Sequence, residues 1–182
     1  MAPMTGVLEW RDIGSSGRTG RGDEEGGVTL YVNEQLECME LHLGMDEEPT
    51  KSLRVRIKGR AGTDDITVGV CYRLPDQDDW VDEALYRQIG AASHSQALVF
   101  MGDLNHPDIC WRDNTAGHKK SRKFLECVDD NFLLQMVEEP TRKGAMLDLV
   151  ITNKEGLVGN VKLKGSLAAG TMKWWSSRSL GQ

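Results

Sequence analysis

The segment LVFMGDLN carries two polar side chains whose types and spacing could bind a metal ion. Asp103 and Asn105 follow the apolar run at 97–101 and are two residues apart, so their side chains share one face of an extended chain. A carboxylate and an amide oxygen are hard ligands that can bind or orient hydrated Mg²⁺ next to a phosphate. Gly102 leaves room for close approach. Taken alone, these residues also fit a polar turn after a core strand.

Two further residues could belong to the same site. Asp148 lies within LDLVITN, where a period of two places it among core residues, so its carboxylate requires a hydrogen-bonded or charged partner. Arg142, or a histidine that the sequence lacks, could be that partner. Tyr72 closes the predicted strand ITVGVCY and would place a phenol at the rim of the same sheet, although a packing role is at least as common for such a tyrosine.

Basic and imidazole side chains further along the chain are candidate phosphate or DNA contacts. His106 follows Asn105, and Lys119 and Lys120 begin the basic run KKSRK at the start of a predicted helix. A solvated loop histidine and a solvated helical face are the more common roles of such residues. Because the net charge is −6, phosphate neutralisation cannot dominate the surface, and any DNA contact has to be local.

The elements that must position these residues are strands and helices in alternation. Alternating or β-branched residues predict strands at 28–32, 37–41, 52–58, 66–72, 97–101, 147–153 and 161–165. Helices are predicted from Asp79 and at about 121–133, the second with Ser121 as N-cap. We expect the first four strands to form an antiparallel sheet. The whole pattern predicts an α/β (α+β) fold of two packed mixed sheets flanked by helices.

Length and composition indicate a soluble globular protein. The 182 residues fit one domain, and 39% hydrophobic residues with 20 glycines favour a loop-rich α/β or β fold. Four widely spaced cysteines without zinc-binding spacing predict free thiols in a reducing compartment. Without a signal-peptide pattern or a membrane-length apolar run, we expect an intracellular protein, nuclear or cytoplasmic, with no membrane partner and no small-molecule cofactor. The oligomeric state stays open.

Three regions are expected along the chain. Residues 1–25 include a Gly-, Ser- and charge-rich stretch and are predicted to be a mobile N-terminal segment. Residues 26–165 contain the predicted strands and helices and form the domain. Residues 166–182, SLAAGTMKWWSSRSLGQ, keep neither the strand period nor the charge pattern, and are predicted to be an unrelated, disordered tail.

From Gly26 to Gly165 the sequence resembles the endonuclease/exonuclease/phosphatase superfamily, and within it the apurinic-type endonuclease domain of LINE-type non-LTR retrotransposons. The resemblance is carried by GGVTLYVNEQLECMEL, SLRVRIKGRAGTDDITVGVCYRLPDQ, MGDLNHPDICWRDNTAG and FLECVDDNFLLQMVEEPTRKGAMLDLVITNKEGLVGNVKLKG. The occurrence of GDLNHPDICW together with LDLVITN is its most specific feature.

This resemblance implies a DNA endonuclease that depends on Mg²⁺ or Mn²⁺ and leaves a 3′ hydroxyl that primes reverse transcription. The resemblance implies that Tyr72 donates a hydrogen bond to the scissile phosphate and that Asp103 positions the attacking water. Asn105 would hold the phosphate, and Asp103 and Asn105 would be weak metal ligands. Asp148 matches the aspartate that orients a catalytic histidine, which explains a carboxylate in a core strand.

The sequence departs from that family at both ends. Family members begin with strands that bear an asparagine and a metal-binding glutamate, and end with a Ser-Asp-His motif, neither of which is present here. Losing one such group costs on the order of 10²–10³ in rate, so we expect a truncated and inactive endonuclease domain. A non-catalytic remnant that binds nucleic acid or protein is the alternative, followed by a phosphoesterase of the same superfamily.

Overall fold

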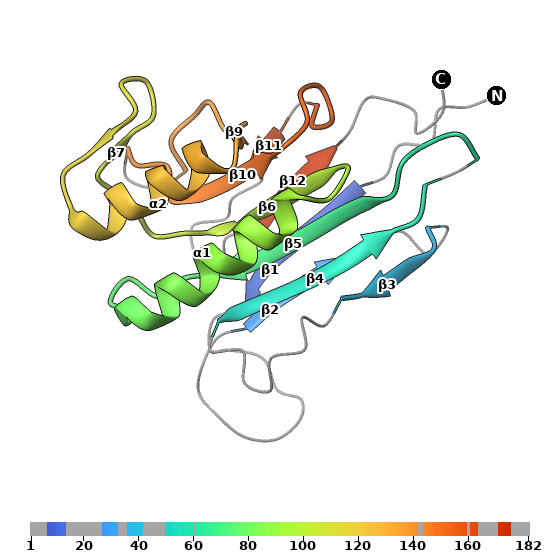
Figure 1. Cartoon of the computed structure of the whole chain (residues 1–182), viewed down its shortest axis with the longest axis horizontal. Coiled ribbons are helices and arrows are strands. Elements are labelled where there is room, and N and C mark those ends of the chain that lie inside the picture. Colours follow the sequence, from blue (N-terminus) through green and yellow to red (C-terminus); the bar gives the residue numbers. More distant parts are fainter. Residues whose placement is uncertain are drawn as a thin grey trace, which may run out of the picture.

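The computed structural model describes residues 7–13, 27–32, 36–41, 50–59, 61–141, 144–159, 161–163 and 171–175. Strands and two helices alternate along these ranges (Figure 1). In chain order the elements are β1 (Val7–Ile13), β2 (Gly27–Tyr31), β3 (Cys38–Glu40), β4 (Lys51–Ile57), β5 (Ile66–Tyr72), α1 (Asp79–Ser93), β6 (Leu98–Asp103), β7 (Ile109–Cys110), β8 (Thr115–Ala116), α2 (Lys119–Asp130), β9 (Leu134–Gln135), β10 (Asp148–Thr152), β11 (Val161–Leu163) and β12 (Thr171–Trp175).

The larger sheet has six strands in the order β3-β4-β5-β6-β10-β9. β5 and β6 are parallel neighbours because α1 crosses over between them, and the other pairs of this sheet are antiparallel. All residues of β6 and β10 are buried, as are all but the last residue of β5. Such continuous apolar runs are typical of central strands that are covered on both faces.

A second, antiparallel sheet has the order β11-β12-β1-β2. Its strand β2 faces the larger sheet, since Val28 and Leu30 pack against a core cluster that includes Val68, Met101 and Val150. In Figure 1 this sheet lies behind the larger one. β7 and β8 form a separate short hairpin.

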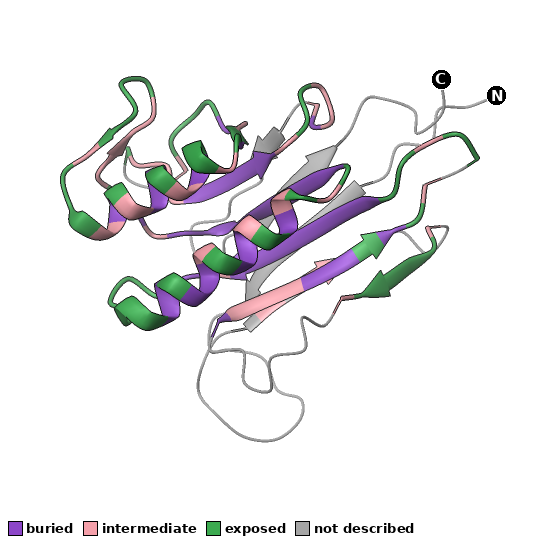
Figure 2. Ribbon diagram, viewed as in Figure 1, coloured by how far each residue is buried: buried purple, intermediate pink, exposed green. Residues whose placement is uncertain are grey.

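Both helices cover the opposite face of the larger sheet. Leu85 and Ile89 of α1 and Phe124 of α2 join Phe100 and Ile151 in a second core cluster. In Figure 2 each helix turns a buried stripe toward the sheet and an exposed face outward, as amphipathic helices do. The molecule is therefore layered as sheet, sheet and helices, which confirms the predicted fold class. Neither of the described helices is long and apolar enough to cross a bilayer.

Three local predictions were wrong. β2 belongs to the second sheet, so the predicted antiparallel run of four strands is reduced to β3, β4 and β5. Residues 7–13 and 171–175 form the paired strands β1 and β12, where an irregular segment and tail were expected. Strand formation depends on partners more than on intrinsic propensity, and β1 has a partner on each side. The remainder of both terminal regions lies outside the described residues.

The start of α2 also differs from the prediction. The helix begins at Lys119, and Ser121 lies inside it. Asp108 takes the capping role expected of Ser121, because its Oδ2 accepts a hydrogen bond from the N–H of His118, the N-cap residue, at 2.7 Å. The Ser121 hydroxyl is consequently available for other contacts.

Candidate functional site

Four polar side chains lie in one row across the larger sheet. Through the register of β4, β5, β6 and β10, Lys51 pairs with Tyr72, Tyr72 with Asp103, and Asp103 with Asp148. Cross-strand partners of this kind have Cα atoms about 5 Å apart and project their side chains to the same face. We call Lys51, Tyr72, Asp103 and Asp148 the polar row.

The alternation of each strand shows which face carries the polar row. Val68 and Val70 of β5 belong to the core cluster between the two sheets, whereas Cys71 belongs to the cluster under the helices. Tyr72 therefore continues the face that meets the second sheet. Met101 in β6 and Val150 in β10 place Asp103 and Asp148 on that face in the same way. The polar row thus ends the apolar layer between the sheets.

Two carboxylates of the polar row are strongly buried. Asp103 is 0% exposed and Asp148 is 6% exposed, and the two are direct Cα partners. Buried carboxylates require hydrogen-bonded or charged partners, and neither of these residues is without one. The structure therefore brings together Tyr72, Asp103 and Asp148, as their predicted common role requires.

Asn105 lies beside the polar row on the loop that follows β6. Its N–H donates to Oδ1 of Asp103 at 3.1 Å, and its Nδ2 donates to the carbonyl of Arg73 at 2.7 Å. Its φ of 47° is in the left-handed region, which asparagine tolerates better than most residues. This backbone conformation turns the chain sharply after Asp103, so that Asn105 reaches the strand end of β5.

Gly102 is required by the packing of strands rather than by a ligand. Its φ is 153°, and a Cβ at this position would lie 1.9 Å from the carbonyl oxygen of Cys71 in the neighbouring strand. The close approach predicted from the sequence is thus between β6 and β5. Burial, followed by the charge of Asp103, raises the pKa of the Cys71 thiol, so this cysteine is a neutral core residue.

The residues at the site offer only part of a metal centre. Asp103, Asp148 and the side-chain oxygen of Asn105 are hard oxygen donors of the kind that Mg²⁺ prefers. Among the residues that the structure describes, however, no group of three or more His, Cys, Asp or Glu side chains could hold a metal ion. The donor chemistry of these three residues fits a divalent cation.

His106, one of the predicted phosphate contacts, is directed away from the polar row. Its side chain is 3% exposed and stacks on Phe124 of α2, with ring centroids 4.9 Å apart. Nδ1 lies 3.1 Å from the Ser121 hydroxyl, which donates to Asp108 at 2.5 Å. Because the serine proton is used in that bond, Nδ1 of His106 is the donor to Ser121. Nε2 faces the Tyr86 hydroxyl at 3.5 Å, and that hydroxyl also donates to the carbonyl of Lys120.

Electrostatics keeps His106 neutral. Burial, followed by the nearby charge of Arg73, lowers the pKa of His106 to about 4. Burial alone would raise the pKa of Asp108, but hydrogen bonds from Ser121 and His118 lower it below its usual range, so this residue is an anion. A buried, neutral imidazole between these groups is poorly suited to bind a phosphate.

The two lysines predicted as DNA contacts differ in their surroundings. Lys119 is exposed at the first position of α2. Lys120 is half-buried: its ammonium group forms an ion pair with Asp79 at 3.2 Å and donates to the carbonyl of Gln77. Lys119 is accessible to a ligand, whereas Lys120 connects the two helices.

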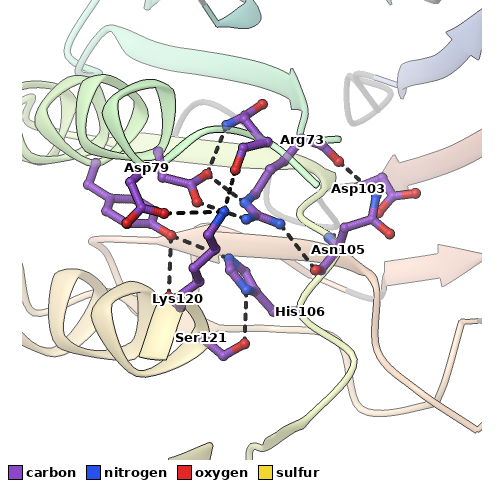
Figure 3. A network of polar contacts seen from close by, with 10 residues as sticks. Arg73, Asp79, Asp103, Asn105, His106, Lys120 and Ser121 are labelled. Carbon is purple, nitrogen blue, oxygen red and sulfur yellow. Dashed lines mark hydrogen bonds and ion pairs between the residues drawn. The ribbon is translucent and has the colours of Figure 1, made fainter. Parts of the chain in front are cut away.

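Sequence reasoning missed Arg73, which directly follows Tyr72 and is 1% exposed. Figure 3 shows it within a network of polar contacts. Its guanidinium forms a two-pronged ion pair with Asp82 of α1, at 2.7 and 2.8 Å. Burial alone would lower the pKa of Arg73, but its bond with Asp82 raises it, so the arginine is charged. We call the surrounding set the helix-side network: Arg73, Gln77, Asp79, Asp82, Tyr86, His106, Lys120 and Ser121.

A signal for Asp82 was present in the sequence, because its spacing to Leu85 and Ile89 places it on the buried stripe of α1. An acid on such a stripe needs a buried partner. Lys51 could not be found in this way, since its place beside Tyr72 depends on the register of β4 with β5.

Comparisons with known proteins agree with this fold. No protein-family model and no curated protein matches the sequence. Among solved structures, the endonuclease domain of TRAS1, a telomere-specific non-LTR retrotransposon, is similar with a TM-score of 0.64 and 18% identity, covering 93% of this chain and 80% of that chain.

Two further structures are similar at lower TM-scores. An inositol polyphosphate 5-phosphatase domain of spSynaptojanin, in complex with inositol (1,4)-bisphosphate and a calcium ion, has a TM-score of 0.49 at 10% identity and covers 92% of this chain and 62% of that chain. An endonuclease/exonuclease/phosphatase family protein from Leptotrichia buccalis has 0.48 at 15%, covering 92% and 70%. The chain has the fold of the TRAS1 endonuclease domain, as the resemblance of its sequence segments predicted.

Proposed function

We propose that the chain is a retrotransposon-type endonuclease domain whose polar row binds a DNA phosphodiester, and that it cleaves DNA inefficiently or not at all. One observation carries the proposal. The register of β5, β6 and β10 aligns Tyr72, Asp103 and Asp148 on one face. The sequence resemblance assigns these same residues to phosphate binding, water positioning and histidine orientation.

Each residue of the site offers a distinct contact to a phosphodiester. The Tyr72 hydroxyl can donate a hydrogen bond to a non-bridging oxygen, and the ammonium group of Lys51 can neutralise phosphate charge. Nδ2 of Asn105 has a second N–H besides the one it donates to Arg73, and this N–H can donate to the phosphate. Asp103, as an acceptor, can orient a water molecule toward the phosphorus.

A divalent cation, Mg²⁺ or Mn²⁺, would be held by Asp103 and the amide oxygen of Asn105, with Asp148 close by. Bound there, it would neutralise phosphate charge and make a bound water more acidic. Because the cation would contact both the Asp103 carboxylate and the phosphate, phosphate binding and metal binding should support each other.

We expect inefficient cleavage because the histidine nearest to the polar row in sequence is engaged in other contacts. His106 is the histidine nearest in sequence to Asn105, but both its ring nitrogens face groups of the helix-side network. It therefore cannot pair with Asp148 in the described conformation. Each missing electrostatic group at a phosphoryl-transfer site reduces the rate by on the order of 10²–10³, and such effects do not simply add.

The experiment compares DNA binding with DNA cleavage. Binding of a fluorescent duplex oligonucleotide is measured in Ca²⁺, in Mg²⁺ and in EDTA, and nicking of supercoiled plasmid is measured in Mg²⁺. We expect the cation to strengthen binding by the unaltered protein and Asp103→Ala to abolish that gain. The control Glu126→Ala, on the exposed side of α2, should behave as the unaltered protein.

The possible outcomes separate the alternatives. Equal DNA affinity of the unaltered protein and Asp103→Ala in every buffer would refute a phosphodiester site at the polar row. Mg²⁺-dependent nicking that Asp103→Ala abolishes would keep the DNA site but overturn the claim of inefficient cleavage. Hydrolysis of a soluble phosphomonoester without DNA binding would indicate a phosphoesterase instead.

A further inference from the structure

Arg73 connects β5 to the loop that carries Asn105, and it does so by three separate bonds. Its N–H donates to the carbonyl of Asp103 at 2.8 Å. Its own carbonyl accepts from Nδ2 of Asn105 at 2.7 Å, and its Nη1 donates to the carbonyl of Asn105 at 3.3 Å. Arg73 thus contacts both the backbone and the side chain of Asn105.

Asp82 fixes the guanidinium that makes one of these bonds. It accepts from Nε and from the second terminal nitrogen of Arg73, and Gln77 donates to it at 2.8 Å. Arg73 and Asp82 are 1% and 3% exposed. With two nitrogens held by Asp82, the third, Nη1, is directed at Asn105 (Figure 3). A planar, rigid donor fork can hold two partners at once in this way.

Asn105 needs such support because its left-handed backbone, with a φ of 47°, is sparsely populated by residues other than glycine. An unconstrained loop would relax toward other conformations, and the backbone N–H of Asn105 would turn away from Asp103. The bonds with Arg73 hold the loop, and they also distinguish the Nδ2 end of the Asn105 side-chain amide from its Oδ1 end. Nδ2 lies at Arg73, so Oδ1 presents an acceptor elsewhere.

We propose that Arg73, fixed by Asp82, is a positioning residue: its guanidinium holds the backbone of Asn105, so that the Asn105 amide, which is bonded to the Arg73 carbonyl, keeps the orientation that receives the phosphodiester and its cation. This inference rests on the proposed function for the role of Asn105. An ion pair that served only to attach α1 to the sheet would need Asp82 alone, and would not need Nη1 of Arg73 to donate to the carbonyl of Asn105.

The test uses Arg73→Lys, which keeps the charge but lacks the fork that serves Asp82 and Asn105 together. DNA affinity in Ca²⁺ is measured for Arg73→Lys, Asn105→Ala and the double variant, and corrected for the folded fraction. We expect each single variant to weaken binding roughly threefold or more, and the double variant to be no weaker than Asn105→Ala.

A matched control is Gln88→Ala. Gln88 is another buried polar residue of α1 and accepts a hydrogen bond from Thr50 at 2.9 Å, so its loss perturbs the helix without touching Asn105. Its folded fraction should fall, while the affinity per folded molecule stays unchanged. Equal losses of affinity in Gln88→Ala and Arg73→Lys would show that Arg73 acts only through stability, and would overturn the proposal.

A second readout does not depend on DNA. The side-chain NH₂ resonances of Asn105, identified by their disappearance in Asn105→Ala, should shift in Arg73→Lys and stay in place in Gln88→Ala. Unchanged resonances and affinity in folded Arg73→Lys would refute the positioning role. If Asn105→Ala leaves DNA affinity unaltered while the resonances still shift in Arg73→Lys, the phosphodiester role of Asn105 fails and the structural link to Arg73 remains.

Discussion

The polar row and the helix-side network meet at two consecutive residues, Tyr72 and Arg73, yet they balance charge in different ways. In the network, Arg73 faces Asp82 and Lys120 faces Asp79, so each cation has an anion within 3.2 Å. In the polar row, two buried carboxylates are direct neighbours, and the lysine of the row lies two strands from the nearer one.

This difference separates a supporting structure from a binding site. A buried set of groups that satisfy one another mainly fixes conformation. Two neighbouring carboxylates offer oxygen acceptors that a bound cation can share. Substitutions in the network should therefore mainly reduce stability, whereas substitutions in the polar row should mainly change binding.

The largest expected effect is on the Arg73–Asp82 ion pair. Asp82→Ala leaves a buried guanidinium without its carboxylate, and we expect the free energy of unfolding to fall by about 3–5 kcal/mol. Asp79→Ala removes an acid three residues earlier whose side chain is 63% exposed, and should cost less than about 1 kcal/mol. Urea denaturation at pH 7 measures both.

The comparison fails if Asp82→Ala and Asp79→Ala lower the unfolding free energy equally. Equal effects would mean that the ion pair is hydrated and contributes as a surface pair does. A fall in DNA affinity per folded molecule is expected for Asp82→Ala alone, because only Asp82 holds the guanidinium that contacts Asn105.

The second prediction concerns pH and His106. Its pKa in the fold is about 4, below the unfolded value of 6.5, so the unfolded chain binds more protons between these values. Stability is therefore complete above about pH 6.5 and is lost as the pH falls toward 4. The shifted pKa of His106 contributes on the order of 3 kcal/mol to the free energy of unfolding at neutral pH.

Urea denaturation at pH 7 and at pH 4.5 tests this dependence in the unaltered protein, His106→Gln and His94→Gln. Carboxylates also titrate in this range, so the contribution of His106 is the difference between variants. We expect His106→Gln to lose less stability on acidification than the unaltered protein, and His94→Gln, at an exposed position, to follow the unaltered protein. Identical pH dependence of all three would show that His106 is not protonated on unfolding.

The sequence was sufficient to predict the fold class and the central strands, because their signals are local. Continuous apolar runs marked β6 and β10, and the four-residue spacing in α1 marked its buried stripe. Motif positions also placed Asp103 and Asn105 directly after a strand, and Asp148 within one. These features depend on neighbours in the chain, which a single sequence displays.

Features that depend on distant partners could not be predicted in the same way. β12 forms because β1 and β11 flank it, and its own residues give little indication of a strand. The burial of His106 depends on the ring of Phe124, in a helix that starts thirteen positions later in the chain. For the same reason the predicted phosphate contact at His106 is not supported by its surroundings.

A smaller effect is expected at the paired carboxylates of the polar row. Asp103→Asn removes one of two facing charges but keeps an oxygen that can accept from the N–H of Asn105. We expect the free energy of unfolding in EDTA to fall by only about 1 kcal/mol, because the amide keeps the size of the side chain and an acceptor oxygen. Asp148→Asn should act alike, and the double variant should lose less than the sum of the two, since the two carboxylates are direct neighbours. A loss as large as that of Asp82→Ala would assign Asp103 to the supporting structure.

The smallest effect is expected at Lys51, and it distinguishes a local phosphate contact from general attraction. Removing one phosphate contact lowers the slope of log affinity against log salt by about 0.9. Lys51→Gln should show that change, and Lys51→Arg should largely restore the slope. Lys58 lies just beyond the opposite end of β4 and pairs with Glu37, so Lys58→Gln should leave the slope unaltered. Equal slopes of log affinity against log salt for Lys51→Gln and Lys58→Gln would mean that both ends of β4 contribute alike. The phosphate would then not lie at the polar row.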